Sequence, residues 1–478
     1  MATAYSMAHK EVVDKILDAD ELKNCYECGI CVATCPVAEL LGKDYNPRHL
    51  LEKTVLDPES VINSPAPWLC AWCYRCFKRC NQGLKLPEIF LEMRKLAVKQ
   101  GKTASSEKAL RTIAENVPLP LVATLVCFHP ERSGLEREET LVKLGLMYDD
   151  YLKRVKAERA QEVSEERVAV IGSGPAGLTV AFELSKKGYG VTVFEALPES
   201  GGMLRKCIPG FRLPRKYLEK EIQALTDLGV EIRTNATVGQ DVNFSGLSRE
   251  GYRAVFIGVG AHKSSNLRVD GADLKGVVQA LEFLWHANCG SEATVGKNVV
   301  VIGGGNVAVD AARVAKASGA KDVAILYRRS EDEMPAIPWE VKEAVAEGVK
   351  IEFLASPKNI VGEKGSVCAI ECVKMELGEP DESGRRKATP IKGSEFKRET
   401  DMVILAIGEG PDVEFLPKEI ELNGDGTVCV DPVTMTTSVQ GVFGGGDAVS
   451  GPATVMEAIV SGKRAAESIM SYLRSLRR

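Results

Sequence analysis

The spacing of hydrophobic residues changes along the chain and divides it into three zones. Residues 1–100 hold short, mostly helical pieces around two cysteine-rich segments. Residues 101–165 are richly charged, and their apolar residues recur at helical spacing, which predicts a helical linker over 103–165. From Arg167 onward, strands rich in β-branched residues alternate with glycine turns and amphipathic helices. This texture predicts an α/β sheet protein.

One pattern occurs twice in the third zone. RVAVIGSGPAGLTVAFELSKKG (167–188) and NVVVIGGGNVAVDAARVAKASG (298–319) each combine an apolar strand, a glycine turn and a helix. Such a unit is typical of a Rossmann-like dinucleotide-binding domain. A third glycine cluster lies beyond the second unit, at 441–466. We therefore expect the first domain to be interrupted by the second, with boundaries at 166–290, 291–405 and 406–478.

The first unit carries a fingerprint for binding a pyrophosphate. Gly172, Gly174 and Gly177 give G-x-G-x-x-G. The first glycine makes the turn, the second lets the backbone approach the pyrophosphate, and the third lets helix and strand pack closely. The helix N-terminus then favours the negative charge, and Glu195 ends the next strand, where an acid can bond a ribose hydroxyl. Other contacts are expected from Pro175 and Ala176.

The second unit has the G-x-G-x-x-A form, with Gly303, Gly305 and Ala308. Its next strand, VAILYRR, ends in Arg328 and Arg329 instead of an acid. Two guanidinium groups at that place suit a 2′-phosphate, which favours NADP(H) over NAD(H). The alternative is that both arginines pair with the acidic SEDE segment that follows. The residues predicted to bind the nucleotide from this turn are Gly303, Gly304, Gly305, Asn306 and Val307.

The third glycine cluster contains Gly446 and Asp447 between a strand and a helix. An acid at such a turn can bond the hydroxyl chain of a ribityl group. Asp447 could equally cap the helix, and only the neighbouring motifs favour FAD.

Eight cysteines between residues 25 and 80 form two segments with the same spacing, C-x2-C-x2-C-x3-C, 45 residues apart. This is the arrangement of ferredoxins with two [4Fe–4S] clusters, in which the fourth cysteine of each segment ligates the other cluster. Zinc sites usually pair two short knuckles across a longer gap. The spacing therefore predicts one cluster on Cys25, Cys28, Cys31 and Cys80, and another on Cys70, Cys73, Cys76 and Cys35.

Composition excludes several other classes of protein. A net charge of −5 argues against nucleic acid as a partner. No apolar run approaches the roughly 18 residues that would span a membrane, and no signal peptide is visible at residue 1. A cytosol keeps thiols reduced, so we expect a cytoplasmic protein whose cysteines bind metal. No C-x2-C or C-x4-C pair lies near the glycine turns, which argues against dithiol chemistry beside a flavin, and we expect no side chain to act as catalytic acid or base.

Residues 167–470 resemble the small subunit of glutamate synthase and the large subunit of ferredoxin-linked transhydrogenases. The motifs that carry this resemblance include VAVIGSGPAGL, PESGGML, IPGFRLP, GADLKGVVQALEFL, VVVIGGGNVAVDAARVA, YRRSEDEMPA and GGGDAVSGPATVMEAI. The resemblance implies FAD in the split domain and NAD(P)H in the inserted one. It also implies FAD contacts from Gly202, Met203, Arg212, Val238, Asp447, Thr454 and Val455.

Residues 20–100 depart from that family and are similar to the small iron–sulfur subunit of heterodisulfide reductases. The segment that carries this likeness runs from CYECGICVATCP to WLCAWCYRCFKRCNQGLKLPEIFLEMRKLAVKQG. The chain therefore looks like a fusion of two electron-transfer modules.

A flavin converts hydride transfer into single-electron transfer. We therefore expect an NAD(P)H oxidoreductase subunit that passes electrons between NAD(P)H, FAD, two clusters and a protein partner. That partner is expected to be a ferredoxin, a heterodisulfide-reductase-type subunit, or a molybdenum or tungsten oxidoreductase. A glutamate synthase small subunit and a non-catalytic redox scaffold are the alternatives. The direction of electron flow, electron bifurcation and the oligomeric state stay open.

Overall fold

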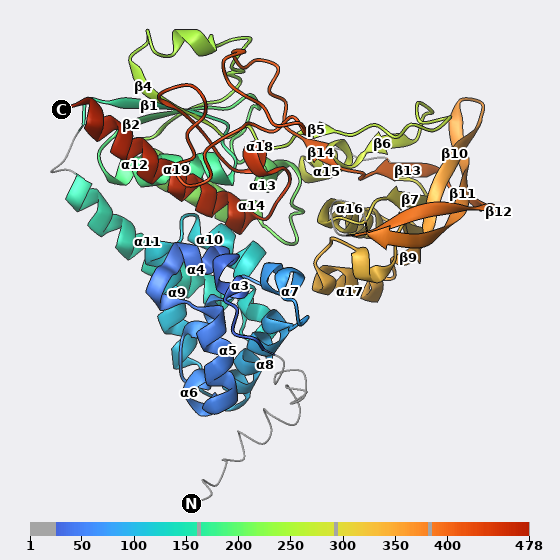
Figure 1. The fold of residues 1–478 in the computed structure, drawn as a ribbon, viewed down its shortest axis with the longest axis horizontal. Coiled ribbons are helices and arrows are strands. Elements are labelled where there is room, and N and C mark those ends of the chain that lie inside the picture. The colour runs from blue at the N-terminus through green and yellow to red at the C-terminus, as the bar shows by residue number, and fades with distance from the viewer. Residues whose placement is uncertain (1–24, 160–163, 291–294, 381–384, 478) are drawn as a thin grey trace, which may run out of the picture. The chain divides into compact units, whose positions relative to one another are not determined.

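The computed structural model describes residues 25–159, 164–290, 295–380 and 385–477, and these divide between two compact units (Figure 1). Unit 1 comprises Met1–Gly202, Arg215–Val259 and Val413–Arg478. Unit 2 comprises Met203–Pro214 and Gly260–Asp412. The chain passes between them after Gly202, Pro214, Val259 and Asp412.

The N-terminal part of unit 1 is helical. Several of its short helices begin with proline just after a polar cap: the Asn46 side chain accepts hydrogen bonds at the start of α5, and Asp57 does so at the start of α6. The long α11 lies within the segment for which the charged residues and the apolar spacing of the linker predicted a helix. The α-helices of this part are α3 (Ile30–Ala33), α4 (Pro36–Leu41), α5 (Pro47–Leu56), α6 (Pro58–Ile62), α7 (Arg75–Arg79), α8 (Leu86–Lys99), α9 (Ala104–Asn116), α10 (Pro120–Ala123) and α11 (Arg137–Arg159).

The rest of unit 1 is built on a parallel sheet with strand order β15-β4-β1-β2-β3. The central β1 is buried from Val168 to Ile171, as its apolar run predicts for a strand covered on both faces. Helices α12 and α19 pack on each other, and Gly462 permits this because a Cβ there would lie 2.5 Å from the Ala176 carbonyl oxygen. The elements are β1 (Arg167–Ile171), α12 (Pro175–Lys186), β2 (Gly190–Phe194), α14 (Arg215–Asp227), β3 (Glu231–Arg233), β4 (Tyr252–Ile257), β15 (Val442–Gly444), α18 (Asp447–Ser450) and α19 (Val455–Leu476).

Unit 2 contains a second parallel sheet, with strand order β6-β13-β7-β8-β9. Its glycine turn follows β7, and its core includes Val299, Val301, Ala308 and Ile325. The elements of this part are α13 (Met203–Lys206), β5 (Lys263–Ser264), β6 (Val277–Gln279), α15 (Ala280–Asn288), β7 (Asn298–Ile302), α16 (Asn306–Ala317), β8 (Asp322–Tyr327), α17 (Pro338–Ala346), β9 (Lys350–Phe353), β13 (Met402–Leu405) and β14 (Glu409–Gly410).

A separate antiparallel layer completes unit 2. It consists of β10 (Ala355–Glu363), β11 (Ser366–Pro380) and β12 (Arg386–Glu399). Ile360 and Ile370 are opposite each other in this layer and contribute to a core cluster that also contains Val300 and Val403 of the parallel sheet.

The predicted fold class is confirmed: two Rossmann-like sheets follow a helical region. The structure differs from the predicted boundary at residue 291, because β6 and α15 lie earlier in the chain and already belong to unit 2. Their pairing with β13 is a long-range interaction, which local sequence pattern does not encode. Among the described helices, none combines the length and the apolar character that crossing a bilayer requires.

Candidate functional site

The glycine turn after β1 forms a cradle, and each of its three glycines is needed for a different structural reason. Gly172 has φ +98°, and a Cβ there would lie 2.4 Å from the Gly258 carbonyl oxygen. A Cβ on Gly177 would lie 2.0 Å from the Gly172 oxygen, so the helix packs directly on the turn. A Cβ on Gly174 would meet no protein atom within 4 Å. The open side of the turn is thus at Gly174, at the N-cap of α12, where no side chain caps the helix. This geometry fits a pyrophosphate.

Glu195 lies directly after β2 and is buried, with 6% of its surface exposed. Its Oε2 accepts hydrogen bonds from the backbone N–H of Ser173 at 3.0 Å and from the Ser173 hydroxyl, and its Oε1 accepts one from Leu197 N–H at 2.8 Å. The hydroxyl of Ser173 also accepts from Gly201 N–H at 2.9 Å. The predicted ribose acid is therefore held in place by neutral donors of the glycine turn.

The third glycine cluster meets the first turn. A Cβ on Gly446 would lie 2.9 Å from the Ala176 side chain, and Gly446 donates its N–H to the Ser461 hydroxyl at 2.9 Å. Asp447 accepts a hydrogen bond from Ala453 N–H at 3.3 Å. The fold therefore brings together Gly172, Gly174 and Gly177 with Gly446 and Asp447, although more than 260 residues separate Gly177 from Gly446 in the sequence.

The residues that only the family resemblance implied fall in different places. A Cβ on Gly202 would lie 2.8 Å from the Gly174 Cα, so Gly202 belongs to the cradle of unit 1. Val238 is buried in the core beside the first sheet. Thr454 caps α19 in a reciprocal box with Glu457, and Val455 is the first residue of that helix. Met203 and Arg212, by contrast, belong to unit 2.

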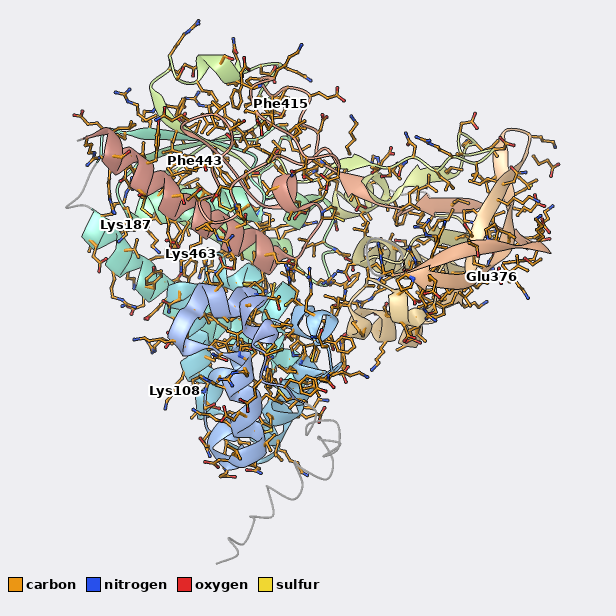
Figure 2. All side chains as sticks on the ribbon, in the orientation of Figure 1. Lys108, Lys187, Glu376, Phe415, Phe443 and Lys463 are labelled. Atoms are coloured by element: carbon orange, nitrogen blue, oxygen red, sulfur yellow. The ribbon has the colours of Figure 1, made fainter. Side chains whose placement is uncertain are left out.

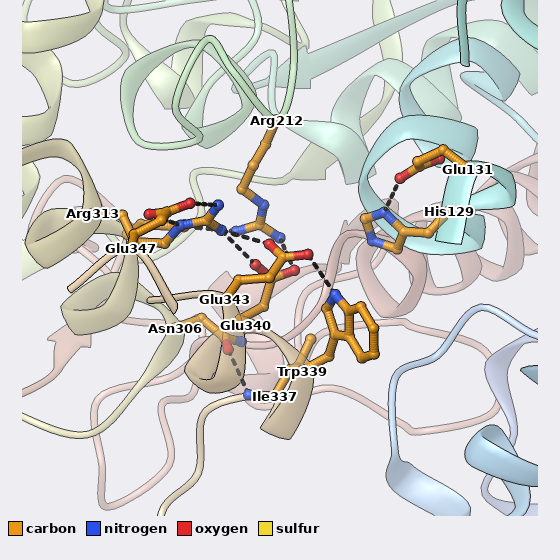
Figure 3. Close-up of polar contacts among 11 residues, drawn as sticks. His129, Glu131, Arg212, Asn306, Arg313, Ile337, Trp339, Glu340, Glu343 and Glu347 are labelled. Carbon is orange, nitrogen blue, oxygen red and sulfur yellow. Dashed lines mark hydrogen bonds and ion pairs between the residues drawn. The ribbon is translucent and has the colours of Figure 1, made fainter. Parts of the chain in front are cut away.

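The glycine turn after β7 repeats the cradle in unit 2. A Cβ on Gly303, at φ +144°, would lie 2.1 Å from the Ala406 oxygen. A Cβ on Gly304 would lie 2.5 Å from the Tyr327 ring, whereas one on Gly305 would meet nothing within 4 Å. The side chain of Asn306 accepts from Ile337 N–H at 2.9 Å, which fastens the turn to the start of α17 (Figure 3). The open position is again the middle glycine of the motif.

The two arginines predicted to select NADP(H) have different environments. Arg328 is exposed. Arg329 is buried, and its Nε donates to the Arg386 carbonyl oxygen of β12 at 2.8 Å. Arg386 itself pairs with Glu333 and donates to the Ser330 hydroxyl at 3.4 Å. Of the SEDE acids, Glu333 is therefore paired with an arginine that the sequence analysis did not consider.

A buried ionic network holds the nucleotide helix α16 (Figure 3). Arg212 donates to both oxygens of Asp310, at 2.9 and 2.8 Å, and its Nη2 lies 3.5 Å from Glu340. Arg313 pairs with Glu340 at 3.0 Å and with Glu347 at 2.6 Å. Burial raises the pKa of Asp310, and the charge of Arg212 opposes that rise. Arg212 is thus engaged with α16 and α17.

The first three cysteines line one cavity together with Cys80 of the second segment. Cys28 is exposed, and the neighbouring Tyr26 is 75% exposed. Burial raises the pKa of Cys31, and the nearby thiols of Cys25 and Cys28 raise it further. We call Cys25, Cys28, Cys31 and Cys80 the outer quartet.

Cys35 instead lies with the second segment. Burial raises the pKa of Cys35 to about 12, and Cys73 and Cys70 contribute to that rise. The same thiols, with Cys35, raise the pKa of Cys76, after burial as the largest cause. We call Cys35, Cys70, Cys73 and Cys76 the inner quartet. The fold thus places Cys80 near the first three cysteines and Cys35 near Cys70, Cys73 and Cys76, and the crossed ligation of two clusters stays a prediction.

This arrangement fits a cluster better than a single ion. Zinc needs four donors at about 2.3 Å from one centre, and no group of three or more His, Cys, Asp or Glu side chains converges in that way within the described residues. Thiols with raised pKa values, such as Cys35 and Cys73, are protonated near neutral pH and release those protons when they bind a metal. Four thiols spread around a cavity match the four corners of a cubane.

Two buried residues beside the inner quartet were missed from the sequence. Arg94, 1% exposed, donates to the carbonyl oxygens of Cys70, Pro67 and Phe128 at 2.6 to 2.8 Å. Tyr45 is buried, and its hydroxyl bonds Cys70. In the sequence, Arg94 is a single arginine on the apolar face of its predicted helix. Local pattern alone does not distinguish such a residue from an arginine at the surface.

Helix α19 connects the inner quartet to the cradle of unit 1. At its first turn, Glu457 forms an ion pair with Arg75, which lies between Cys73 and Cys76. Farther along, Lys463, labelled in Figure 2, donates to the Leu40 oxygen at 3.4 Å, and Arg464 pairs with Glu39. Both of these partners belong to α4, whose N-cap is Cys35. One helix therefore touches both chain segments of the inner quartet and the glycine cradle of unit 1.

Comparison with known proteins agrees with these features. A family model described as pyridine nucleotide-disulphide oxidoreductase matches residues 166–462, and one described as a 4Fe-4S dicluster domain matches residues 21–84. FprA from Mycobacterium tuberculosis, solved in complex with NADPH, shares the fold with a TM-score of 0.57 and 22% identity, over 66% of this chain and 86% of its own.

Three curated relatives are more similar in sequence. The beta subunit of the NADP(+)-dependent formate dehydrogenase of Moorella thermoacetica is 43% identical, over 84% of this chain and 60% of the relative. The beta subunit of the NADPH-Fe(3+) oxidoreductase of Geobacter sulfurreducens is 36% identical, over 95% of this chain and 71% of the relative. The small chain of the NADPH glutamate synthase of Escherichia coli is 38% identical, over 64% of this chain and 69% of the relative, which confirms the predicted resemblance. The chain thus spans 60 to 71% of the length of these relatives.

Proposed function

This chain belongs to the pyridine nucleotide-disulphide oxidoreductase family and carries a 4Fe-4S dicluster domain, and from this we propose that it is the electron-transfer subunit of an NADPH-dependent oxidoreductase complex. It exchanges electrons between NADPH, FAD, two [4Fe–4S] clusters and a protein partner. The observation that carries the proposal is α19, which contacts the FAD cradle and the inner quartet within one compact unit.

When bound, FAD takes a hydride from a nicotinamide and releases its two electrons singly, which iron–sulfur clusters accept. The chain's own residues then bind and orient. The open N-terminus of α12 at Gly174 receives the pyrophosphate of FAD, and Ser173 holds Glu195 toward the ribose. Asp447 and the capped start of α19 complete this cradle.

NADPH binds at the second cradle, with its pyrophosphate at Gly305. Arg328 is the exposed arginine after β8 and is the residue that we assign to the 2′-phosphate. NADH stays the alternative. The names of the relatives, which specify NADP(+) or NADPH, support the choice.

The inner quartet holds the cluster on the flavin side, and the outer quartet holds the cluster through which electrons leave. This order is supported by burial. Cys70 and Cys76 are buried and α19 contacts their segment, whereas Cys28 and Tyr26 are exposed at the outer cavity. A partner that exchanges single electrons would approach that cavity.

The partner is a ferredoxin or another redox subunit. Two relatives are named beta subunits, of a formate dehydrogenase and of an Fe(3+) oxidoreductase, which supports assembly with at least one other subunit. The binding of a heterodisulfide-reductase-type subunit or of a molybdenum or tungsten oxidoreductase belongs to the same proposal.

Anaerobic titration of the purified chain with NADPH, and separately with NADH, tests this function by absorbance and EPR. We expect NADPH to bleach the flavin and to produce the EPR signals of reduced clusters. Bleached flavin with clusters that stay oxidised would contradict the path. Reduction by NADH alone would overturn the assignment of Arg328, and reduction by neither nucleotide would favour a scaffold role.

The similarity to glutamate synthase small chains supports one rival function. It predicts a large amidotransferase partner and formation of glutamate from glutamine and 2-oxoglutarate. Detecting that product in the native complex would replace the proposed partner while keeping the internal path.

A further inference from the structure

The ion pair between Arg75 and Glu457 joins two features that each belong to a cofactor site. Arg75 opens α7 and is flanked by Cys73 and Cys76 of the inner quartet. Glu457 is the third residue of α19, the helix whose first turn completes the FAD cradle. Both belong to unit 1, and their side chains are partly shielded, 37% and 20% exposed.

Glu457 is held rigidly, because it has a second role. Its Oε2 accepts hydrogen bonds from Thr454 N–H at 3.0 Å and from the Thr454 hydroxyl at 2.7 Å, while Thr454 accepts from Glu457 N–H at 3.3 Å. This reciprocal box uses one carboxylate oxygen, and the other, Oε1, faces Arg75. The capping box therefore fixes where the negative charge lies.

Arg75 acts on the inner quartet through its backbone and its charge. Arg75 follows Cys73 by two residues and directly precedes Cys76, so its backbone and its guanidinium charge stay close to two ligand positions of the quartet. The positive charge of Arg75 is thus felt at a ligand position. Arg94 supplies another positive charge near Cys70. Because Arg94 is fully buried and donates to three carbonyl oxygens, we expect its effect on the quartet to be the same in all variants at Arg75 and Glu457.

We propose that Glu457 is a charge-tuning and positioning residue, which partly neutralises Arg75 and so sets the reduction potential of the inner-quartet cluster at the flavin side. The inference rests on the proposed function, which assigns no role in tuning the cluster to Arg75 or Glu457. Reduction adds one negative charge to a cluster, so a less compensated Arg75 stabilises the reduced form, and loss of Arg75 destabilises it.

The test is a dye-mediated potentiometric titration of the full chain followed by EPR, which needs no NADPH. Glu457→Gln keeps an oxygen acceptor for the capping box and removes only the charge. We expect it to raise the potential of one of the two clusters, so that the ratio of reduced to oxidised cluster at a fixed potential increases about two- to fivefold. Arg75→Gln should lower the same potential, and Arg75→Lys should restore most of it.

Glu166→Gln is the matched control, because it removes one charge from the Arg477 pair at the C-terminal end of α19, whereas Arg75 lies at the N-terminal turn of that helix. It should leave both potentials unchanged. Unchanged potentials in Glu457→Gln, or shifts of equal size in Glu166→Gln, would overturn the proposal. If Arg75→Gln fails to assemble its clusters, Glu457→Gln alone decides. Absence of [4Fe–4S] signals in the unsubstituted chain would instead contradict the proposed function.

Discussion

The two glycine turns have nearly the same backbone, but they differ in the charges that surround them. In both turns, a Cβ on the first glycine would clash with the backbone just after an adjacent strand of the same sheet. A Cβ on the middle glycine would meet no protein atom within 4 Å. Beside the first turn, Glu195 is held by N–H and hydroxyl donors. Beside the second, Tyr327 covers Gly304 and the following residue is an exposed arginine. The fold thus presents an open glycine turn twice, and under the proposed function the residues after the second strand select the dinucleotide.

The largest expected effect comes from closing one turn at a time. Gly174→Val and Gly305→Val each place a side chain where no protein atom lies within 4 Å, so the fold should survive while the pyrophosphate is excluded. Gly174→Val should lose bound flavin but keep its clusters. Gly305→Val should keep flavin and lose reduction by NADPH.

For both variants, absorbance measures bound flavin, iron content measures the clusters, and stopped-flow kinetics measures reduction by NADPH. The control is Gly424→Val, at an exposed glycine where a Cβ would also meet no atom within 4 Å. If Gly305→Val lost flavin as well, the two turns would not be the independent sites that the comparison assumes.

The buried charges of unit 2 should be the next most sensitive feature. Arg313→Leu leaves the almost fully buried Glu340 with less positive charge around it, and we expect it to destabilise unit 2 by about 3–5 kcal/mol. Thermal unfolding and limited proteolysis measure the effect. Lys358→Gln, which breaks an exposed pair with Glu395, should change stability much less than Arg313→Leu does. Equal effects would show that burial does not distinguish these pairs.

Removing the exposed arginine should change the nucleotide preference. Arg328→Ser loses a charge-assisted bond to the 2′-phosphate, worth about 1.5–3 kcal/mol, so kcat/KM for NADPH should fall roughly 10- to 100-fold. The value for NADH should change little. Lys321→Ser, just before β8 and thus at the opposite end of that strand, is the matched control. A parallel loss with both nucleotides would place the effect in general binding and not in selectivity.

The smallest effect concerns a buried acid of unit 1 that neutral donors hold. Burial raises the pKa of Glu221 to about 8, although Leu121 N–H at 2.7 Å and the Tyr148 hydroxyl oppose the rise. The folded chain therefore keeps a proton that the unfolded chain releases above about pH 4.3. Between that pH and about 8 the unfolded state binds fewer protons, so stability falls as pH rises.

Glu221→Gln keeps an oxygen that can accept the hydrogen bond from Leu121 N–H, and it removes the titration. Its thermal midpoint should vary less between pH 6 and pH 8.5 than that of the unsubstituted chain, and it should be the more stable of the two at pH 8.5. A steeper pH dependence in the variant would contradict this account.

The sequence predicted the features that depend on spacing along the chain. The two strand-turn-helix units and the interruption of one domain by another follow from local motifs and their order, whereas the crossed ligation of two clusters stays a prediction from the cysteine spacing. It did not predict that residues 203–214 join unit 2, because that depends on Arg212 meeting Asp310 across 98 positions. The ion pair of Arg75 with Glu457 and the β10–β12 layer were also missed, since such pairings form only once the chain has folded.

The position of β15 and α19 has a consequence for biosynthesis. Strand β4 has β15 as its neighbour in the sheet, yet all of residues 260–412 are translated between them. At a translation rate of roughly 5–20 residues per second, the edge of β4 that pairs with β15 stays unpaired for many seconds during synthesis. The cradle at Gly174 also lacks Gly446 and α19 during that time. If the cradle binds FAD as proposed, loading of FAD follows translation of the inserted unit. A growing chain that stalls within that unit is exposed to aggregation through the unpaired edge of β4.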